Sequence, residues 1–430
     1  MSDSSITNWE GVFKTVYGAQ GPVELIPAMA MLYREIKISD KEKQGLKFSI
    51  PVLVAHSQGF TYNTTSNNAF DLNTAISAIT QEAEVSASEV ALTNILPYRT
   101  ISRSQGNEKA FQEATDFCVY EMKESHVKRL EIAYLYGGQS GGIIEADSSA
   151  NIGANSTTVT FTAGSWADGI VCGIEGAEVG FYAANGTQVV GISTGTGIFV
   201  LTAPNPNSKT MVVTAAVASD ITALDTALSS ANSFAFFRGA YGEECVGILA
   251  QIANTGSQFG ISAATYGLWR GNVYSCGSAQ LTMRKVLKGA AIAYSRGLEG
   301  KCRVLCNPLG FADLASDMAS YRRYDGSYSS EKASNGSKMI SFYGQNGEIE
   351  IVGHAGVKPQ DAFLVDFKHM RRLGSSDVVF GMPKAGAAGA AFQFVPSKMG
   401  FEIRSYSDNC IFIDAPARFV HFSAIVNLNA

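Results

Sequence analysis

The stretch "KFSIPVLVAHSQGFTYN", residues 47–63, decides how the rest of the chain is interpreted. Apolar residues occupy every second position of its first half: Phe48, Ile50, Val52 and Val54. A two-residue apolar period predicts a β-strand with one covered face. Because proline cannot donate a backbone hydrogen bond, Pro51 places this strand at the edge of a sheet.

Ser57 is the first candidate for a catalytic residue, because "AHSQG" is close to the nucleophile elbow, in which a serine lies between two glycines. The elbow requires a strand, a tight turn and then a helix. The residues that follow, "QGFTYNTTSNNAF", are typical of turns, and Ala55 stands where the elbow has glycine. We therefore predict that Ser57 lies on an extended segment and that the protein is not an enzyme.

A second apolar run, "QEAEVSASEVALTNILPY", follows this segment and is predicted to return beside it. Residues 48–104 would then form one long two-stranded flap, with Glu82 and Glu84 on the face opposite the apolar side chains. A two-stranded ribbon is marginally stable alone in water, and its open edges invite pairing. We expect the flap to lie on neighbouring copies of the chain, in a heterologous contact that builds rings or shells.

Three further regions complete the chain. "NEKAFQEATDFCVYEMKESHVKRLEIAYLYG", residues 107–137, is predicted to be a long helix, capped by Asn107, ended by Gly137 and packed on more than one side. Residues 148–237 contain six charged residues and an Asn185-Gly186 hairpin signal, which favour a small all-β sandwich or barrel. The remainder alternates helices and strands, with Leu287, Ala290, Ala291, Tyr294 and Leu298 expected as one buried stripe.

Composition excludes several classes of function. A net charge of −5 without a long basic run argues against tight nucleic-acid binding. The seven cysteines show no metal-binding spacing, so we predict reduced thiols, no metal site and no cofactor. No signal peptide and no stretch of about 18 apolar residues is present, which predicts a cytosolic protein without a membrane partner.

The order of these segments resembles the major capsid protein of tailed bacteriophages, an α+β protein of the Hong Kong 97-type capsid fold. The resemblance rests on "KFSIPVLVAHSQGFTYN", on the long helix ending "LEIAYLYG", on "RVLCNPLGFADL" and on "YSDNCIFIDAP". It implies an N-terminal arm (1–47), an E-loop (48–104), a spine helix with the start of the peripheral domain (105–147) and an inserted β domain (148–238). A return to the peripheral domain (239–280) and an axial domain with C-terminal peripheral strands (281–430) would follow.

The resemblance also implies a function and partners. Many copies would assemble as hexamers and pentamers into an icosahedral virion shell around double-stranded DNA, in the host cytoplasm, with a portal, a scaffolding protein and a possible decoration protein. DNA contacts would be weak and non-specific. The residues expected at contacts between subunits are Phe60, Tyr62, Phe70, Glu82, Glu84, Arg99, Arg103, Arg322, Arg323 and Asp325.

One feature of the family is absent. Its prototype cross-links its shell through an E-loop lysine, and this chain has no lysine between Lys47 and Lys109. Non-covalent stabilisation is therefore expected. Two alternatives stay open at this stage: the shell protein of an encapsulin nanocompartment, and a β-rich tail or adhesin protein, against which the long helix argues.

Overall fold

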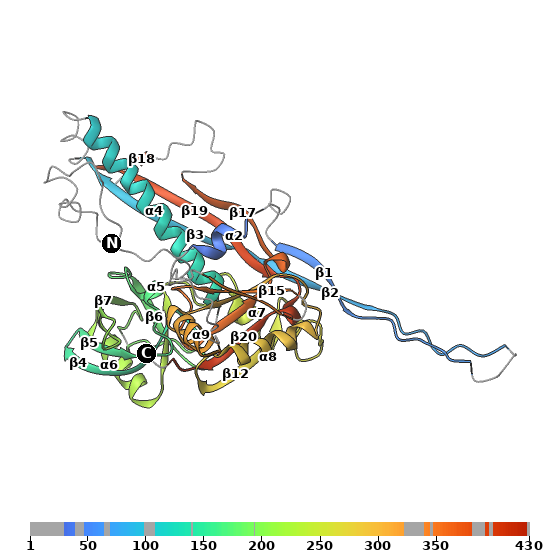
Figure 1. Ribbon diagram of the computed structural model, residues 1–430. Helices are drawn as coiled ribbons and strands as arrows, with labels where there is room; N and C mark the ends of the chain where they lie inside the picture. The colour runs from blue at the N-terminus through green and yellow to red at the C-terminus, as the bar shows by residue number, and fades with distance from the viewer. Residues whose placement is uncertain are drawn as a thin grey trace, which may run out of the picture.

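A computed structural model of the chain describes residues 30–38, 47–63, 69–98, 108–138, 141–192, 194–321, 339–344, 347–380, 392–394 and 399–427. A thin arm projects from one side of a body that contains a long helix, two sheets and a barrel (Figure 1). No helix in these ranges is both long enough and apolar enough to cross a membrane.

Strands β1 (Lys47–Ala55) and β2 (Ile79–Ser86) form the base of the arm. They pair antiparallel, with Lys47 opposite Ser86 and a register shift between Leu53 and Ala55. Among the described residues each is the other's single strand partner, which is the edge position expected from Pro51. Residues 56–63 and 69–78 continue beyond the strands as the outer part of the arm.

The structure differs from the expected flap in its second half. Strand β3 (Ser88–Pro97) leaves β2 after a single residue and pairs along its whole length with β19 (Gly400–Ile413). Strands β17 (Met370–Phe380) and β18 (Phe392–Phe394) occupy the other edge of β19. Leu96 is buried against the long helix, so these residues gain a core that the arm lacks.

The long helix, α4 (Glu108–Tyr136), has 29 residues and is about 43 Å long. Cys118 and Met122 pack on the four-stranded sheet, whereas Leu130 and Tyr134 join the largest core of the molecule. The helix ends at Gly137 as expected, and Gly138 follows it with a φ of 100°. Asn107, the expected cap, lies outside the described residues.

A closed six-stranded barrel follows the helix. Its strands, in order around the barrel, are β4 (Ile144–Gly153), β5 (Ser156–Phe161), β8 (Thr210–Ala215), β7 (Phe199–Asn205), β6 (Glu178–Ala183) and β9 (Ser233–Phe237). The chain also forms helix α6 (Ala218–Ser230) and the short α5 (Asp168–Val171), so the all-β expectation is wrong for these residues. Ile221, Leu224 and Leu228 give α6 a buried face at helical spacing.

A mixed six-stranded sheet forms the other half of the body. Its strand order is β12 (Asn272–Ala279), β20 (Val420–Ile425), β16 (Ala362–Val365), β13 (Cys302–Cys306), β15 (Glu348–Gly353) and β14 (Met339–Tyr343). Helices α8 (Met283–Tyr294) and α9 (Pro308–Tyr321) pack on one face and enclose a second core. Alternate residues of the sheet, such as Val304 and Leu305, face the two different cores.

The expected buried stripe of α8 is confirmed in part: Ala290 is buried, as is Leu298 beyond the end of the helix, whereas Ala291 is exposed and Tyr294 is half-buried. Val286, Gly289, Ala290 and Ala293 face the sheet, and Leu287 remains 42% exposed. Short elements complete the fold: α2 (Met31–Glu35), α7 (Ile248–Gln251), β10 (Ser257–Gln258), β11 (Ile261–Ser262), and the 3-10 turns η3 (Phe367–His369) and η4 (Pro416–Arg418).

Candidate subunit-contact surface

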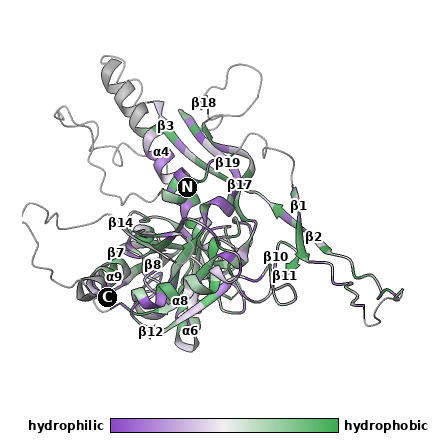
Figure 2. Ribbon diagram, turned by 45° about the vertical axis from the view of Figure 1, so that its right-hand side comes forward, coloured by the Kyte–Doolittle hydropathy of each residue, from purple (hydrophilic) through white to green (hydrophobic). Residues whose placement is uncertain are grey.

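The arm exposes an unusual amount of apolar surface. Seven large apolar side chains on it are exposed: Leu53, Phe60, Tyr62, Phe70, Leu72, Ile76 and Ile79. Tyr62 and Leu72 retain 84% and 80% of their accessible surface. Hydrophobic residues recur along the projecting ribbon with no other part of the chain against them (Figure 2). A concentration of this kind marks an interaction site.

The outer part of the arm nevertheless has a defined local structure. The Gln58 amide donates to the Ile76 carbonyl over 3.1 Å, and the Asn73 side chain donates to the Phe60 carbonyl over 2.9 Å. Gly59 lies where the two legs meet, because a Cβ there would be 2.9 Å from the Ile76 nitrogen. The legs are therefore joined to each other while their side chains face solvent.

Ser57 lies on this extended and exposed part of the arm. No helix follows it in residues 58–63, and no described residue hydrogen-bonds to its hydroxyl or to the His56 ring. Strand β1 ends two residues before Ser57, but without a helix after it the stretch is not a nucleophile elbow. Gly59, which completes the motif in the sequence, serves the close approach of the two legs instead.

The base of the arm is fixed to the body. Val54, Ala83 and Val85 are buried in the main core, and the Glu84 amide donates to the Phe259 carbonyl over 3.1 Å. On the opposite face the Glu84 carboxylate pairs with Lys47 at 3.3 Å, and Glu82 accepts from the Ser49 hydroxyl. The two glutamates are therefore exposed on one face of the ribbon, as the alternation predicted.

The expected contact residues fall into two groups. Phe60, Tyr62, Phe70, Glu82 and Glu84 come together on the arm, where each is exposed. The other five lie outside the described residues: Arg99, Arg103, Arg322, Arg323 and Asp325. The exposed apolar residues Leu53, Leu72 and Ile76 could have been added from the sequence, because they lie in the same segment.

Residues 30–38, which we call the strap, contact the body of the subunit in a way that the sequence did not predict. The backbone amides of Leu32 and Tyr33, in α2, donate to the two oxygens of Glu131 on the long helix α4, over 2.7 and 2.9 Å. His354, which follows β15, contacts the same carboxylate at 3.0 Å through Nε2. Glu131 is fully buried, so one carboxylate joins the strap to the helix and to the six-stranded sheet.

Arg372, on β17, holds the other side of the strap. Its guanidinium lies 4.4 Å from the Tyr33 ring and donates to Asp377 over 2.7 Å, and the Tyr33 hydroxyl donates to the same carboxylate. Burial and the bond to Asp377 raise the pKa of Tyr33 to about 12. A further ion pair, 2.8 Å long, joins Arg303 of β13 to Glu35. No sequence motif predicts these contacts of the strap, because the paired residues are far apart in the sequence.

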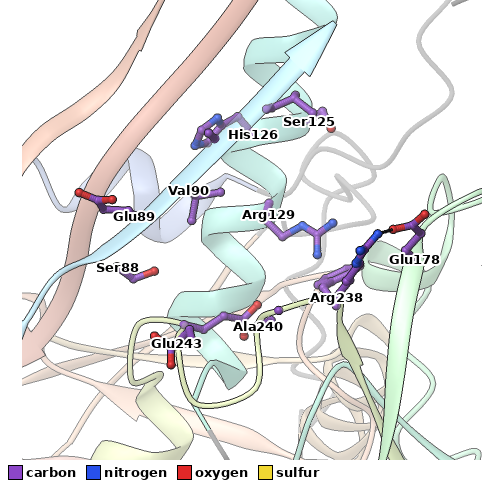
Figure 3. Close-up of a pocket in the computed structure, with 15 residues that line it drawn as sticks. Ser88, Glu89, Val90, Ser125, His126, Arg129, Glu178, Arg238, Ala240 and Glu243 are labelled. Carbon is purple, nitrogen blue, oxygen red and sulfur yellow. Dashed lines mark hydrogen bonds and ion pairs between the residues drawn. The ribbon is translucent and has the colours of Figure 1, made fainter. Parts of the chain in front are cut away.

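A cavity of about 540 Å³ lies between α4, β3 and residues 237–244 (Figure 3). The Arg129 guanidinium stacks 3.0 Å from the centroid of the Phe237 ring, and burial lowers the pKa of Arg129 to about 10. Burial raises the pKa of Glu244 to about 7, and the positive charge of Arg129 opposes that rise. At the rim Arg238 pairs with Glu178 at 2.6 Å.

His126 also lines this cavity and is a candidate for a catalytic base. Its two ring nitrogens contact the hydroxyls of Ser405 and Ser407, at 2.9 and 2.7 Å. Burial lowers the pKa of His126 to about 4, so the ring is neutral and a weak base at pH 7. Both serines are fully buried, and both ring nitrogens are occupied by hydroxyls rather than by a carboxylate of the described residues, so His126 is a satisfied core histidine.

The described residues contain no group of three or more histidine, cysteine or acidic side chains arranged to hold a metal ion. The surface that the geometry singles out is therefore the arm, which is suited to contact with another macromolecule.

Comparison with known proteins gives the fold. No protein-family model and no curated protein sequence matches the chain. Among solved structures, the capsid asymmetric unit of cyanophage A-1(L) aligns with a TM-score of 0.54 at 11% identity, over 96% of both chains. This chain has the fold of a phage capsid subunit. The α+β architecture expected from the sequence is confirmed, and the alignment extends over nearly all of it.

Weaker likenesses of the capsid fold include the capsid of a native GTA particle and the SrpI encapsulin complex of Synechococcus elongatus. The first has a TM-score of 0.48 at 7% identity, over 99% of this chain and 100% of the other. The second has a TM-score of 0.42 at 8% identity, over 99% and 96%.

Proposed function

We propose that this chain is the major capsid protein of a tailed bacteriophage, a structural subunit that assembles with many copies of itself into the virion shell. The exposed arm is the observation that carries this proposal, because its seven large apolar side chains are 43–84% exposed in the isolated chain. The capsid fold supplies the context in which such an arm has a use.

The reach of the arm supports a contact with a neighbour. The outer legs of the arm, residues 56–63 and 69–78, contain eight and ten residues, which at roughly 3.3 Å per residue extend about 25–35 Å beyond its base. A folded chain of this length has a radius of gyration of about 22 Å, and hence a diameter of roughly 55 Å. The arm can therefore reach across about half of an adjacent copy, and repetition of this heterologous contact closes rings.

The parts of the family fold can be proposed on the described elements. Strands β1 and β2 with residues 56–78 would be the E-loop, and α4 would be the spine helix. The four-stranded sheet around β19 would belong to the peripheral domain, and the six-stranded sheet with α8 and α9 to the axial domain. The barrel would be the inserted domain.

Partners follow from the same proposal. Assembly in the host cytoplasm would use a scaffolding protein and a portal, and the shell would hold DNA by weak contacts that suit a net charge of −5. Because residues 48–108 contain no lysine, the E-loop cannot supply the cross-link of the prototype. A decoration protein or the barrel would then stabilise the shell without a covalent bond.

Electron microscopy of the purified full-length chain, with analytical ultracentrifugation over a range of concentrations, tests the proposal. Closed shells, or pentamers and hexamers that close when a scaffold is supplied, are expected. A monodisperse monomer at every concentration, with strong hydrogen-exchange protection of amides 56–63 and 69–78, would refute it. Shells that enclose a co-purifying enzyme instead of DNA would favour the encapsulin alternative.

A further inference from the structure

Helix α8 presents a second apolar stripe to solvent. Its exposed residues follow helical spacing: Arg284, Leu287, Lys288, Ala291 and Ile292. A shallow hollow of about 530 Å³ lies along this face, between Met283 and Ala291. Because the opposite stripe is buried on the sheet, the helix is apolar on two sides, which is typical of a helix packed from two directions.

The same face is basic. Helix α8 contains three basic residues, Arg284, Lys285 and Lys288, and no acidic residue. Lys285 is engaged within the chain, since its ammonium donates to the carbonyls of Cys276 and Gln280. Arg284 and Lys288 are exposed and form no ion pair with any described residue. Asp317, on α9, accepts a hydrogen bond from the Met283 amide at the start of α8.

The arm has the complementary character. The arm, residues 47–86, contains three acidic residues, Asp71, Glu82 and Glu84, and one basic residue, Lys47, which gives a net charge of −2. Asp71 is exposed on the outer part of the arm, between the exposed side chains of Phe70 and Leu72. Asp71 could therefore pair with the basic side chains beside Leu287, while its apolar neighbours cover the leucine.

Two other hollows of the described surface fit the arm less well. The cavity beside Arg129 is lined by four glutamates, Glu89, Glu178, Glu243 and Glu244, and by two arginines, Arg129 and Arg238. The acidic side chains outnumber the basic ones, and Arg238 already pairs with Glu178, so the cavity does not attract an acidic partner. The groove between α6 and residues 183–192 has no charged side chain in its lining, so it offers the arm no electrostatic attraction.

From these observations we infer that the exposed face of α8 is the receptor for the arm of a second copy, which docks Phe70–Leu72 over Leu287 between Arg284 and Lys288. The inference rests on the proposed function, because it names the surface that the arm covers in the shell. The arm leads away from the body of its own chain, so the occupant is another subunit (Figure 1).

Cross-linking of assembled shells tests the contact. The variant D71C/K288C, treated with a short bis-maleimide, is expected to give a ladder of covalent oligomers on a denaturing gel, since each subunit donates one arm and receives another. The matched control is D71C/I152C, because Ile152 is 58% exposed on the barrel. The parent chain measures the background from its native cysteines, of which six are buried.

A charge exchange gives a second measurement. K288E is expected to raise the concentration needed for assembly about tenfold at low salt, because it replaces an attraction with a repulsion. D71K alone should act in the same direction, and D71K/K288E should restore assembly. If the parent forms shells while K288E assembles normally, or while the control pair cross-links as well as D71C/K288C, the α8 receptor is wrong and the proposed function stands. If the parent forms no shells under any condition, the proposed function fails first.

Discussion

The strap and the arm lie close together in the sequence, yet the chain treats them in opposite ways. The strap, residues 30–38, is fixed by buried polar groups of three other elements. The outer part of the arm, residues 56–63 and 69–78, bonds mainly to itself and leaves its large side chains exposed. The strap is packed against its own subunit, whereas the side chains of the outer arm are left exposed, and we propose that a neighbouring copy covers them.

The difference lies in what surrounds each segment. Leu32 is fully buried beside a carboxylate that accepts both free amides at the start of α2. Leu72 is 80% exposed on a ribbon two strands wide. Burial of apolar area supplies most of the stability of a folded chain. The strap therefore contributes to the stability of the subunit, whereas under the proposed function the arm contributes to that of the assembly.

The largest effect is expected from shortening the arm. The legs meet at Gly59 and Ala75, so residues 60–74 can be replaced by Asn-Gly, which favours a two-residue hairpin turn. We expect this variant to lose shell formation completely, because the surface that reaches a neighbour is gone. Its free energy of unfolding should change by less than about 1 kcal/mol, because no core residue is removed. Electron microscopy and urea denaturation give the two measurements, and shells of normal yield would contradict the comparison.

A substitution that breaks the contacts of the strap should instead lower the stability of the subunit. E131A leaves two buried amides and His354 without their acceptor, and each unsatisfied buried group costs about 1–3 kcal/mol. We expect the subunit to lose about 4 kcal/mol of unfolding free energy, measured by urea denaturation. E124A, on the same helix, is the control and should stay within about 0.5 kcal/mol. An E131A subunit as stable as its control would show that the clamp contributes little.

The contrast also explains what could be predicted from the sequence. The two-residue alternation around Pro51 and the helical spacing of 107–137 are local signals, and the structure confirms both elements. The pairing of β3 with β19, and the bond from Leu32 to Glu131, depend on residues that only folding brings together; in the second case they are 99 positions apart. Leu287 shows a third limit, because an apolar residue at helical spacing can face a core or a partner.

Matched leucines sharpen the comparison. L32A removes a fully buried side chain and should lower the unfolding free energy of the subunit by about 3 kcal/mol. L72A should leave that free energy within about 0.5 kcal/mol and reduce assembly instead. Thermal denaturation of the unassembled chain, paired with light scattering during assembly, separates the two effects. Equal losses of subunit stability would mean that the arm packs on its own chain in solution.

The smallest effect depends on pH and concerns Glu244, in the cavity between α4 and the end of the barrel. Its pKa is about 7 in the folded chain, against an ordinary value of 4.5, because burial disfavours the charged form more than Arg129 favours it. E244Q removes the titration and keeps the shape of the side chain. At pH 8 we expect this variant to be about 2 kcal/mol more stable than the parent, a value reduced for the opening of the cavity to solvent.

The sign follows from proton binding. Between pH 4.5 and about 7 the unfolded chain releases the Glu244 proton while the folded chain retains it, so the stability of the parent falls as pH rises through this window. Below pH 4.5 both states are protonated, and the parent and E244Q should be equally stable. Denaturation midpoints of the two proteins at pH 4, 6 and 8 should therefore diverge progressively. The cavity lies between α4 and the barrel, apart from the arm, so the concentration needed for assembly should not show the same pH dependence. If it does, the cavity and the arm are coupled, and subunit stability and assembly are not separate at this site.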